Sequence, residues 1–193
     1  MPVEENERSD AELMSEVAEG DHHAFTELMS RYKTPLFRFI LRYVGSPSDA
    51  EDLLQDVFVN VYSKAATYDP AWKASTWIYR IALNKCRDHG RKQRLRRFFS
   101  IDRRDDDEDS HYVAEPTDPG ASVESIVARR QELAKLTSAI EQLPHNLRSA
   151  LVMHSIEGRS QTECAEILGV SRKSVEMLVY RARKALRAQL GED

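Results

Sequence analysis

The chain has 193 residues, of which 41% are hydrophobic and 31% are charged, with a net charge of −4, as is typical of a soluble protein rich in charged helices. No run of about 18 apolar residues could span a membrane, and the acidic start MPVEENERSDAEL argues against a secretory signal. Cys86 and Cys164 lie far apart without a CxxC pair, which argues against a disulfide framework or a zinc knuckle and suits a reducing cytoplasm.

Apolar residues spaced by three and four predict four helices in the first half of the chain. Pro35 is expected to kink the second helix or to shift its hydrogen bonding, and Ser48 is expected to cap the third. The loop TYDPAWKAS precedes the fourth. The predicted ranges are Asp10–Glu19, Asp21 to about Val44, Asp49–Ala65, and Thr76 to about Arg97.

Residues from about Ser100 to Ser122 lack apolar periodicity and hold prolines and the acidic run DDDED, which indicates a linker. A second helical unit follows it. Its predicted helices are Val123–Leu143, Pro144 to about Ile156, Gln161–Leu168, and a last helix capped by Ser171. The first of these carries the apolar residues Ile126, Val127, Leu133, Leu136 and Ile140. With no strand pattern and no repeat, the prediction is an all-α fold of two small helical domains joined by a flexible acidic linker.

The segment QTECAEILGVSRKSVEMLVYRA has the spacing of a helix-turn-helix. Ala165 is small where the two helices cross, and Gly169 allows the left-handed backbone of the turn. The expected buried positions are Cys164, Leu168, Val170, Val175 and Leu178. Cys164 is therefore interpreted as a core residue and not as a metal ligand or nucleophile.

The outer face of the last helix suits a DNA major groove, which admits one helix and meets its N-terminal part. Arg172, Lys173, Glu176 and Met177 would lie at base edges, followed by Tyr180 and Arg181, with Lys184 and Arg187 near phosphates. A glutamate can accept a hydrogen bond from cytosine N4, and a methionine can contact a thymine methyl group.

The fourth predicted helix carries an outward stripe at Trp77, Arg80, Asn84, Arg87 and Arg91. Such a stripe suits single-stranded DNA or a groove, since arginine binds phosphate and aromatic rings stack on bases. A plain solvated surface, with Trp77 partly in the core, explains it as well. Two basic blocks on predicted helices, separated by the acidic linker, favour nucleic-acid binding.

Three segments in this order resemble a bacterial σ factor of the extracytoplasmic-function (ECF, group IV) class of the sigma-70 family. They are DAEDLLQDVFVNVY, STWIYRIALNKCRD, and LPHNLRSALVMHSIEGRSQTECAEILGVSRKSVEMLVYRARKAL. The resemblance covers about Leu13 to Leu190. It implies a σ2 domain at residues 1–98, a linker at 99–122 and a σ4 domain at 123–193, without the larger intervening domain of housekeeping σ factors.

The resemblance also implies site residues. The segment that would bind core RNA polymerase, at the clamp helices of the β′ subunit, contains Asp49, Glu51, Asp52, Leu53, Gln55, Asp56 and Phe58. The reader of the promoter −10 element, where a base is flipped out, would use Trp72, Lys73, Trp77, Arg80, Asn84, Lys85, Arg87 and Arg91. The −35 reader would use Ser171, Arg172, Lys173, Ser174, Glu176, Met177, Tyr180, Arg181 and Lys184. Glu176 and Met177 stand where many members of the family carry basic and small residues. The resemblance therefore does not imply a particular −35 sequence for this chain.

The implied partners are core RNA polymerase (β′ clamp helices and β flap), promoter DNA and an anti-σ factor, often membrane-anchored. The protein itself is expected in the cytoplasm, without membrane insertion. The acidic linker is expected to act either as a mimic of RNA or as a flexible spacer. The alternative function is a stand-alone helix-turn-helix regulator. No Gly-rich phosphate loop, HExxH motif or nucleophile elbow appears, so no enzyme, cofactor or metal site is predicted, and His22-His23 is interpreted as helix-start surface.

Overall fold

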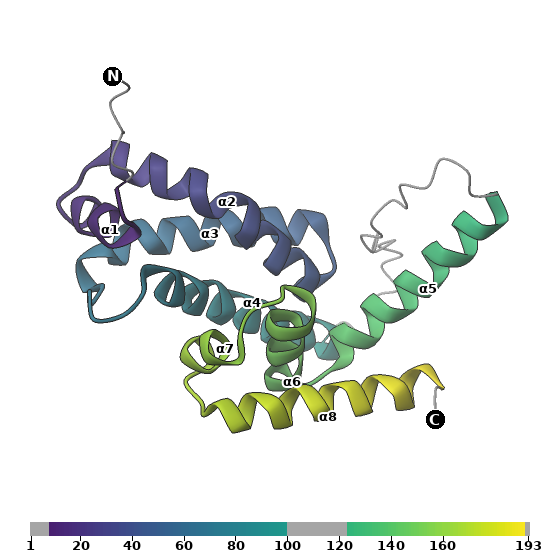
Figure 1. Ribbon diagram of the computed structural model, residues 1–193. Helices are drawn as coiled ribbons and strands as arrows, with labels where there is room; N and C mark the ends of the chain where they lie inside the picture. The colour runs from purple at the N-terminus through teal and green to yellow at the C-terminus, as the bar shows by residue number, and fades with distance from the viewer. Residues whose placement is uncertain (1–7, 100–122, 192–193) are drawn as a thin grey trace, which may run out of the picture.

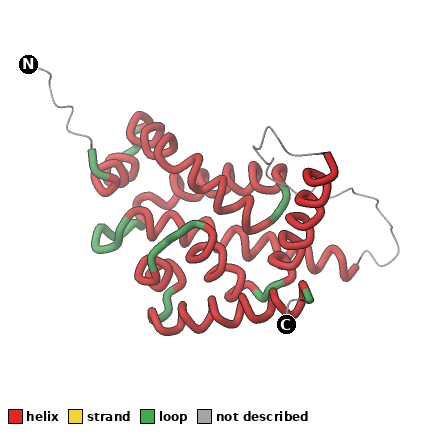
Figure 2. The backbone as a smooth tube through the Cα atoms, turned by 45° about the vertical axis from the view of Figure 1, so that its right-hand side comes forward, coloured by secondary structure: helices red, strands yellow, loops and turns green. Residues whose placement is uncertain are grey.

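The computed structural model describes residues 8–99 and 123–191, and within these ranges all regular secondary structure is helical (Figures 1 and 2). The predicted all-α class is therefore confirmed. The first unit contains α1 (Asp10–Ala18), α2 (His22–Val44), α3 (Pro47–Lys64), a short 3₁₀ turn η1 (Ala65–Thr67) and α4 (Ala74–Phe99). The second contains α5 (Val123–Gln142), α6 (His145–Ala150), a π-helical turn η2 (Leu151–Ile156), α7 (Gln161–Leu168) and α8 (Arg172–Leu190). None of the helices in these described ranges is long and apolar enough to cross a membrane.

Side-chain caps explain where the first helices begin. Asp21 accepts hydrogen bonds from the backbone N–H groups of His23 and Ala24 and so begins α2. The cap of α3 is Ser46, so the prediction of Ser48 is wrong. Pro47 at the first helical position has the backbone angle that a helix start requires, which moves the cap to the residue before it.

The core of the first unit forms where α2, α3 and α4 pack together, with α1 across one end (Figure 1). The fully buried side chains come from all three long helices and include Leu28, Leu36, Phe39, Ile40, Val57, Val61, Ile78 and Ala82. Pro35 lies inside α2, which nevertheless runs unbroken from His22 to Val44. The fourth helix begins at Ala74, two residues before the predicted Thr76, and Thr76 is itself buried.

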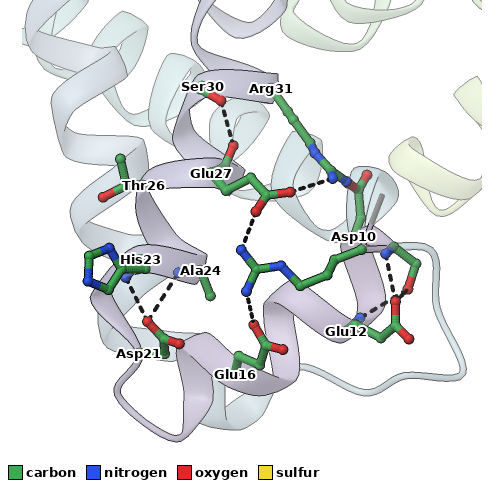
Figure 3. Close-up of polar contacts among 12 residues, drawn as sticks. Asp10, Glu12, Glu16, Asp21, His23, Ala24, Thr26, Glu27, Ser30 and Arg31 are labelled. Atoms are coloured by element: carbon green, nitrogen blue, oxygen red, sulfur yellow. Dashed lines mark hydrogen bonds and ion pairs between the residues drawn. The ribbon is translucent and has the colours of Figure 1, made fainter. Parts of the chain in front are cut away.

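Ion pairs join α1 to α2 and neutralise part of the acidic N-terminal block (Figure 3). Arg31 donates to Asp10 at 2.8 Å and to Glu27 at 2.6 Å. Arg8 donates to Glu16 at 2.7 Å and also pairs with Glu27. These pairs are partly exposed, so each contributes modestly to stability.

The second unit packs α6, α7 and α8 around Val152, Met153, Cys164, Val175 and Ala182, all fully buried. The apolar side chains of Val127, Leu133 and Leu136 on α5 are exposed. The buried side chains Ala139 and Ile140 lie at the C-terminal end of α5, while its N-terminal part extends away from the rest (Figure 1).

The helix-turn-helix of α7 and α8 is present as predicted. Gly169 ends α7 with a left-handed φ of 67°, and the N–H of Val170 donates to the carbonyl of Ala165 at 3.1 Å. Cys164 and Val175 are buried, whereas Val170 is exposed, contrary to the prediction, because it stands in the turn after α7. Cys164 is a free thiol in the core.

The two units pack against each other through the C-terminal end of α2 and the N-terminal half of α4. Figure 1 shows α7 lying between α4 and α8. Gly45, which ends α2 with a φ of 79°, permits a close approach of α5, since a Cβ there would overlap the carboxylate of Glu141. The contacts between the units therefore involve the same helix, α4, that carries the predicted DNA-binding stripe.

Candidate nucleic-acid interface

The outer face of α8 is exposed along most of the predicted reading surface, and only Ser174 of the predicted residues is half-buried. Val175, Val179 and Ala182 are buried on the opposite face, which turns Arg172, Lys173, Glu176, Met177, Tyr180, Arg181 and Lys184 toward solvent. Tyr180 is 62% exposed, which is a high value for an aromatic side chain. The face can therefore present hydrogen-bonding, ionic and apolar groups to a groove.

Ser171 fixes the start of this reading helix. Its hydroxyl oxygen accepts from the backbone N–H of Ser174 at 3.1 Å, and the two hydroxyl groups lie 2.8 Å apart. The remaining N–H groups of the first turn point out of the helix end, where they suit a phosphate. Ser171 and Ser174 thus contribute mainly by orienting α8.

The loop before α4 is shaped by its own hydrogen bonds. Asp69 accepts from the N–H of Ala71 at 2.9 Å through its side chain, and the hydroxyl of Tyr68 donates to the carbonyl of Trp72 at 2.6 Å. Trp72 is 46% exposed, and the Arg80 guanidinium lies over its ring at 4.6 Å from the centroid. The exposed indole is thus held at the start of α4.

Trp77 has a different environment. It is half-buried and packs edge-on against Tyr68, with ring centroids 5.7 Å apart. Its ring thus belongs partly to the core, unlike that of Trp72, so only Trp72 has a freely exposed face for stacking on a base.

Further along α4, the predicted stripe is exposed and lightly paired. The side-chain oxygen of Asn84 accepts from Arg87 at 2.9 Å, and Arg91 pairs with Asp88 at 2.6 Å. Lys85 lies 3.1 Å from Asp56 on α3. Lys73, in the preceding loop, is exposed. Weak surface pairs of this kind exchange readily for contacts to phosphate.

A basic cavity of about 620 Å³, which no sequence pattern predicted, lies where α2, α4, α5 and α6 meet. Its lining includes Arg87, Arg91, Arg94, His145 and Arg148. Burial, and then the charges of Arg87, Arg148 and Arg94, lower the pKa of His145 to about 4. The basic block of α4 indicated Arg94, but nothing in the sequence indicated that α6 would place Arg148 and His145 beside it.

The acidic segment on α3 is divided between surface and core. Glu51, Asp52, Gln55 and Asp56 are exposed, and Asp49 lies 3.3 Å from the Nε2 atom of His89. Leu53 and Phe58 are buried, so little of either reaches the surface.

An apolar groove of about 870 Å³ runs beside this acidic face, between α2 and α3. Its apolar lining is formed by Phe25, Met29, Phe37, Leu54, Phe58, Val59 and Tyr62. Val59 is 64% exposed, which is unusual for so apolar a side chain beside other apolar groups. The sequence did not indicate this groove, because its residues come from two helices.

The fold and these surfaces define a two-domain DNA-binding protein with a helix-turn-helix in the second domain and a separate acidic and apolar surface on the first. Residues 28–96 match the family described as Sigma-70 region 2, and residues 133–186 match the family described as Sigma-70, region 4.

Proteins of similar sequence or structure align with this chain over nearly its whole length. The RNA polymerase sigma factor CnrH of Cupriavidus metallidurans is 36% identical over 97% of each chain. The ECF RNA polymerase sigma factor SigW of Bacillus subtilis is 29% identical over 92% of this chain and 94% of that one. A solved structure of CnrH in complex with the cytosolic domain of CnrY has a TM-score of 0.66 at 29% identity, covering 96% of this chain and 99% of that chain. The chain therefore belongs to the ECF class of the sigma-70 family and is an RNA polymerase σ factor.

Proposed function

We propose that residues 1–98 bind core RNA polymerase and melt the −10 element, and that residues 123–193 read the −35 element. The observation that carries this proposal is the separation of two chemically opposite surfaces. An acidic and apolar surface lies on α2 and α3, and exposed basic faces lie on α4 and α8. Acidic side chains around an apolar centre suit a basic partner helix, whereas the basic faces suit DNA.

The polymerase contact is proposed to combine the exposed carboxylates of Glu51 and Asp52 with the groove. Apolar anchors at the centre of an interface supply most of the affinity, and surrounding charges steer the encounter. Because Leu53 and Phe58 are both buried, we assign the anchoring role to the exposed Val59, which lines the groove.

A reconstituted run-off assay with core RNA polymerase tests the proposal. The chain is expected to give a promoter-dependent transcript, and Asp52→Arg is expected to reduce both core binding and transcript. Glu19→Arg is the matched control, because Glu19 is also an exposed carboxylate on the first unit but lies far along the sequence from α3. Absence of both core binding and transcript with the unmodified chain would leave the stand-alone regulator as the better explanation.

We further propose that the protein is cytoplasmic and not an enzyme. We also propose that an anti-σ factor holds the protein inactive by covering the groove. Support comes from the groove itself and from the solved complex of the related CnrH with the cytosolic domain of CnrY. The test is a purified candidate partner added to the run-off assay. A true anti-σ factor abolishes the transcript of the unmodified chain. In a direct binding measurement without polymerase, Val59→Glu, which places a charge in the groove, weakens the complex with that partner. A partner that binds Val59→Glu and the unmodified chain equally binds elsewhere.

A further inference from the structure

The basic cavity where α2, α4, α5 and α6 meet has the composition of an anion-binding site. Its described lining contains the carboxylate of Glu141 and four arginines, which are Arg87, Arg91 and Arg94 on α4 and Arg148 on α6. Like charges gathered in one place repel one another, and an anion bound among them offsets that cost. We propose that this cavity binds a small polyphosphate, meaning a di- or triphosphate group that is either inorganic or part of a nucleotide.

Arg148 presents a half-buried guanidinium whose described hydrogen-bond acceptors are all uncharged. Its Nη1 and Nη2 atoms donate to the backbone carbonyl groups of Tyr43 and Leu143, at 3.2 and 3.4 Å. Its Nε atom is buried and has no hydrogen-bond partner among the described residues. Burial lowers the pKa of Arg148, because a desolvated cation is costly unless an opposite charge lies beside it. A phosphate oxygen supplies both the negative charge and an acceptor.

His145 adds a donor of a different kind to the same cavity. Its Nδ1 atom contacts the hydroxyl of Tyr43. Burial, and then the charges of Arg87, Arg148 and Arg94, lower the pKa of His145, so the ring is neutral at pH 7. When Nδ1 accepts from the tyrosine hydroxyl, Nε2 of the neutral ring carries the hydrogen and can donate to an oxyanion. The cavity thus offers both charged and neutral donors to a phosphate group.

The spacing of the α4 arginines favours a chain of phosphates over a single small ion. Arg87, Arg91 and Arg94 follow one another by four and three residues, so they share one face of the helix over about 10 Å. The planar guanidinium group suits phosphate oxygens, which it binds through paired N–H donors. The cavity volume of about 620 Å³ is in the range of small-molecule sites. A di- or triphosphate has enough charged oxygens to bind more than one of these arginines at once.

The present partners of the α4 arginines can be exchanged for such a ligand. Arg87 donates to the uncharged side chain of Asn84, and the pair of Arg91 with Asp88 is exposed and therefore weak. Arg87 and Arg91 are also assigned to the −10 element, so a bound polyphosphate would compete with promoter DNA. That consequence rests on the proposed function, whereas binding of the anion is a property of the free chain and does not depend on it.

Isothermal titration calorimetry of the full-length free chain, at one fixed ionic strength and without magnesium, tests the proposal. The two ligands are inorganic triphosphate and adenosine triphosphate, which share the phosphate chain and differ in the nucleoside. Saturable binding at a single site is expected for at least one of them. Tighter binding of adenosine triphosphate would identify a nucleotide as the ligand, and equal or weaker binding would identify the phosphate chain alone. Absence of saturable binding for both would overturn the proposal.

Two arginines of α4 provide a matched comparison. Arg94→Gln removes an exposed arginine of the lining, and Arg96→Gln removes an exposed arginine of the same helix that lies outside the lining. Loss of one charge-assisted contact is expected to weaken triphosphate binding about fivefold in Arg94→Gln, with little change in Arg96→Gln. Equal weakening in both variants would show a diffuse attraction to basic residues of α4 and would overturn the assignment to the cavity.

Arg148→Gln distinguishes a small anion from the DNA backbone. The variant is expected to weaken triphosphate binding about tenfold, because it removes the half-buried guanidinium. Its affinity for a single-stranded oligonucleotide of unrelated sequence, measured by fluorescence anisotropy, is expected to stay unchanged. Equal losses for both ligands would assign the cavity to DNA phosphates and overturn the proposal. Circular dichroism verifies the fold of the variant, and if it is unfolded the same two ligands are compared on Arg94→Gln.

Discussion

His145 makes the packing of the two units against each other, the closed arrangement, sensitive to pH. In the closed protein, burial and neighbouring arginines lower the pKa of His145 to about 4, compared with about 6.5 for a solvated histidine. Above pH 6.5 the imidazole is neutral in both arrangements, so closure keeps its full stability. As the pH falls from 6.5 toward 4, only the open protein takes up the proton, and closure loses free energy. The charged and titratable groups around the imidazole are Arg87, Asp88 and Arg94 on α4, Arg148 on α6, Tyr43 on α2 and Glu141 on α5.

The size of the effect follows from the shift. With these two pKa values, the loss at pH 5.5 is about 1.4 kcal/mol, or about tenfold in the closed-to-open ratio. His145 is only half-buried, so solvent screening reduces the loss to roughly 1 kcal/mol. The Tyr43 hydroxyl contributes in the same direction, since it can donate to Nδ1 of the neutral ring but not to that of the imidazolium.

Small-angle X-ray scattering of the free chain between pH 7.5 and 5.5 measures the change as an increase in radius of gyration. His145→Gln keeps a hydrogen-bonding side chain but cannot be protonated in this range, so its radius is expected to change little. His23→Gln, at the solvent-exposed start of α2, is the control that retains the pH response. If the unmodified chain and His145→Gln expand equally, the histidine does not control closure and the reasoning is refuted.

Three further substitutions separate the assigned roles. Asn84→Ala is expected to impair −10 melting, measured by permanganate footprinting of the promoter, far more than core binding, and equal losses would remove the assignment. Glu176→Ala is expected to change the preferred −35 sequence in a selection from randomised DNA, with about 1–3 kcal/mol of altered discrimination at one position; a uniform drop in affinity would reduce Glu176 to a surface charge. Asp10→Ala removes the acceptor of the Tyr32 hydroxyl at 2.5 Å and the ion pair with Arg31, so urea unfolding is expected to lose about 1–2 kcal/mol, and an unchanged midpoint would count against this network.

Helical periodicity predicted the elements well because it depends on residues close in sequence. The caps Asp21 and Ser171 and the turn glycine Gly169 were all found, since each acts within one helical turn. The exposed face of α8 followed from the same periodicity. Predictions of buried positions were wrong where burial depends on whether another part of the chain packs over the residue. Val170 was expected at a buried position of the helix-turn-helix, yet it is exposed in the turn after α7.

The groove and the interface between the units could not be predicted in this way. Val59 lines the groove only because α2 and α3 pack at one particular register. The contact to Arg80 uses the backbone carbonyl of Glu166, which every residue type would offer, so the side chain at that position carries no signal. Sequence patterns thus predicted which surfaces bind DNA, and only the structure shows that Arg80, on one of these predicted surfaces, contacts another part of the same chain.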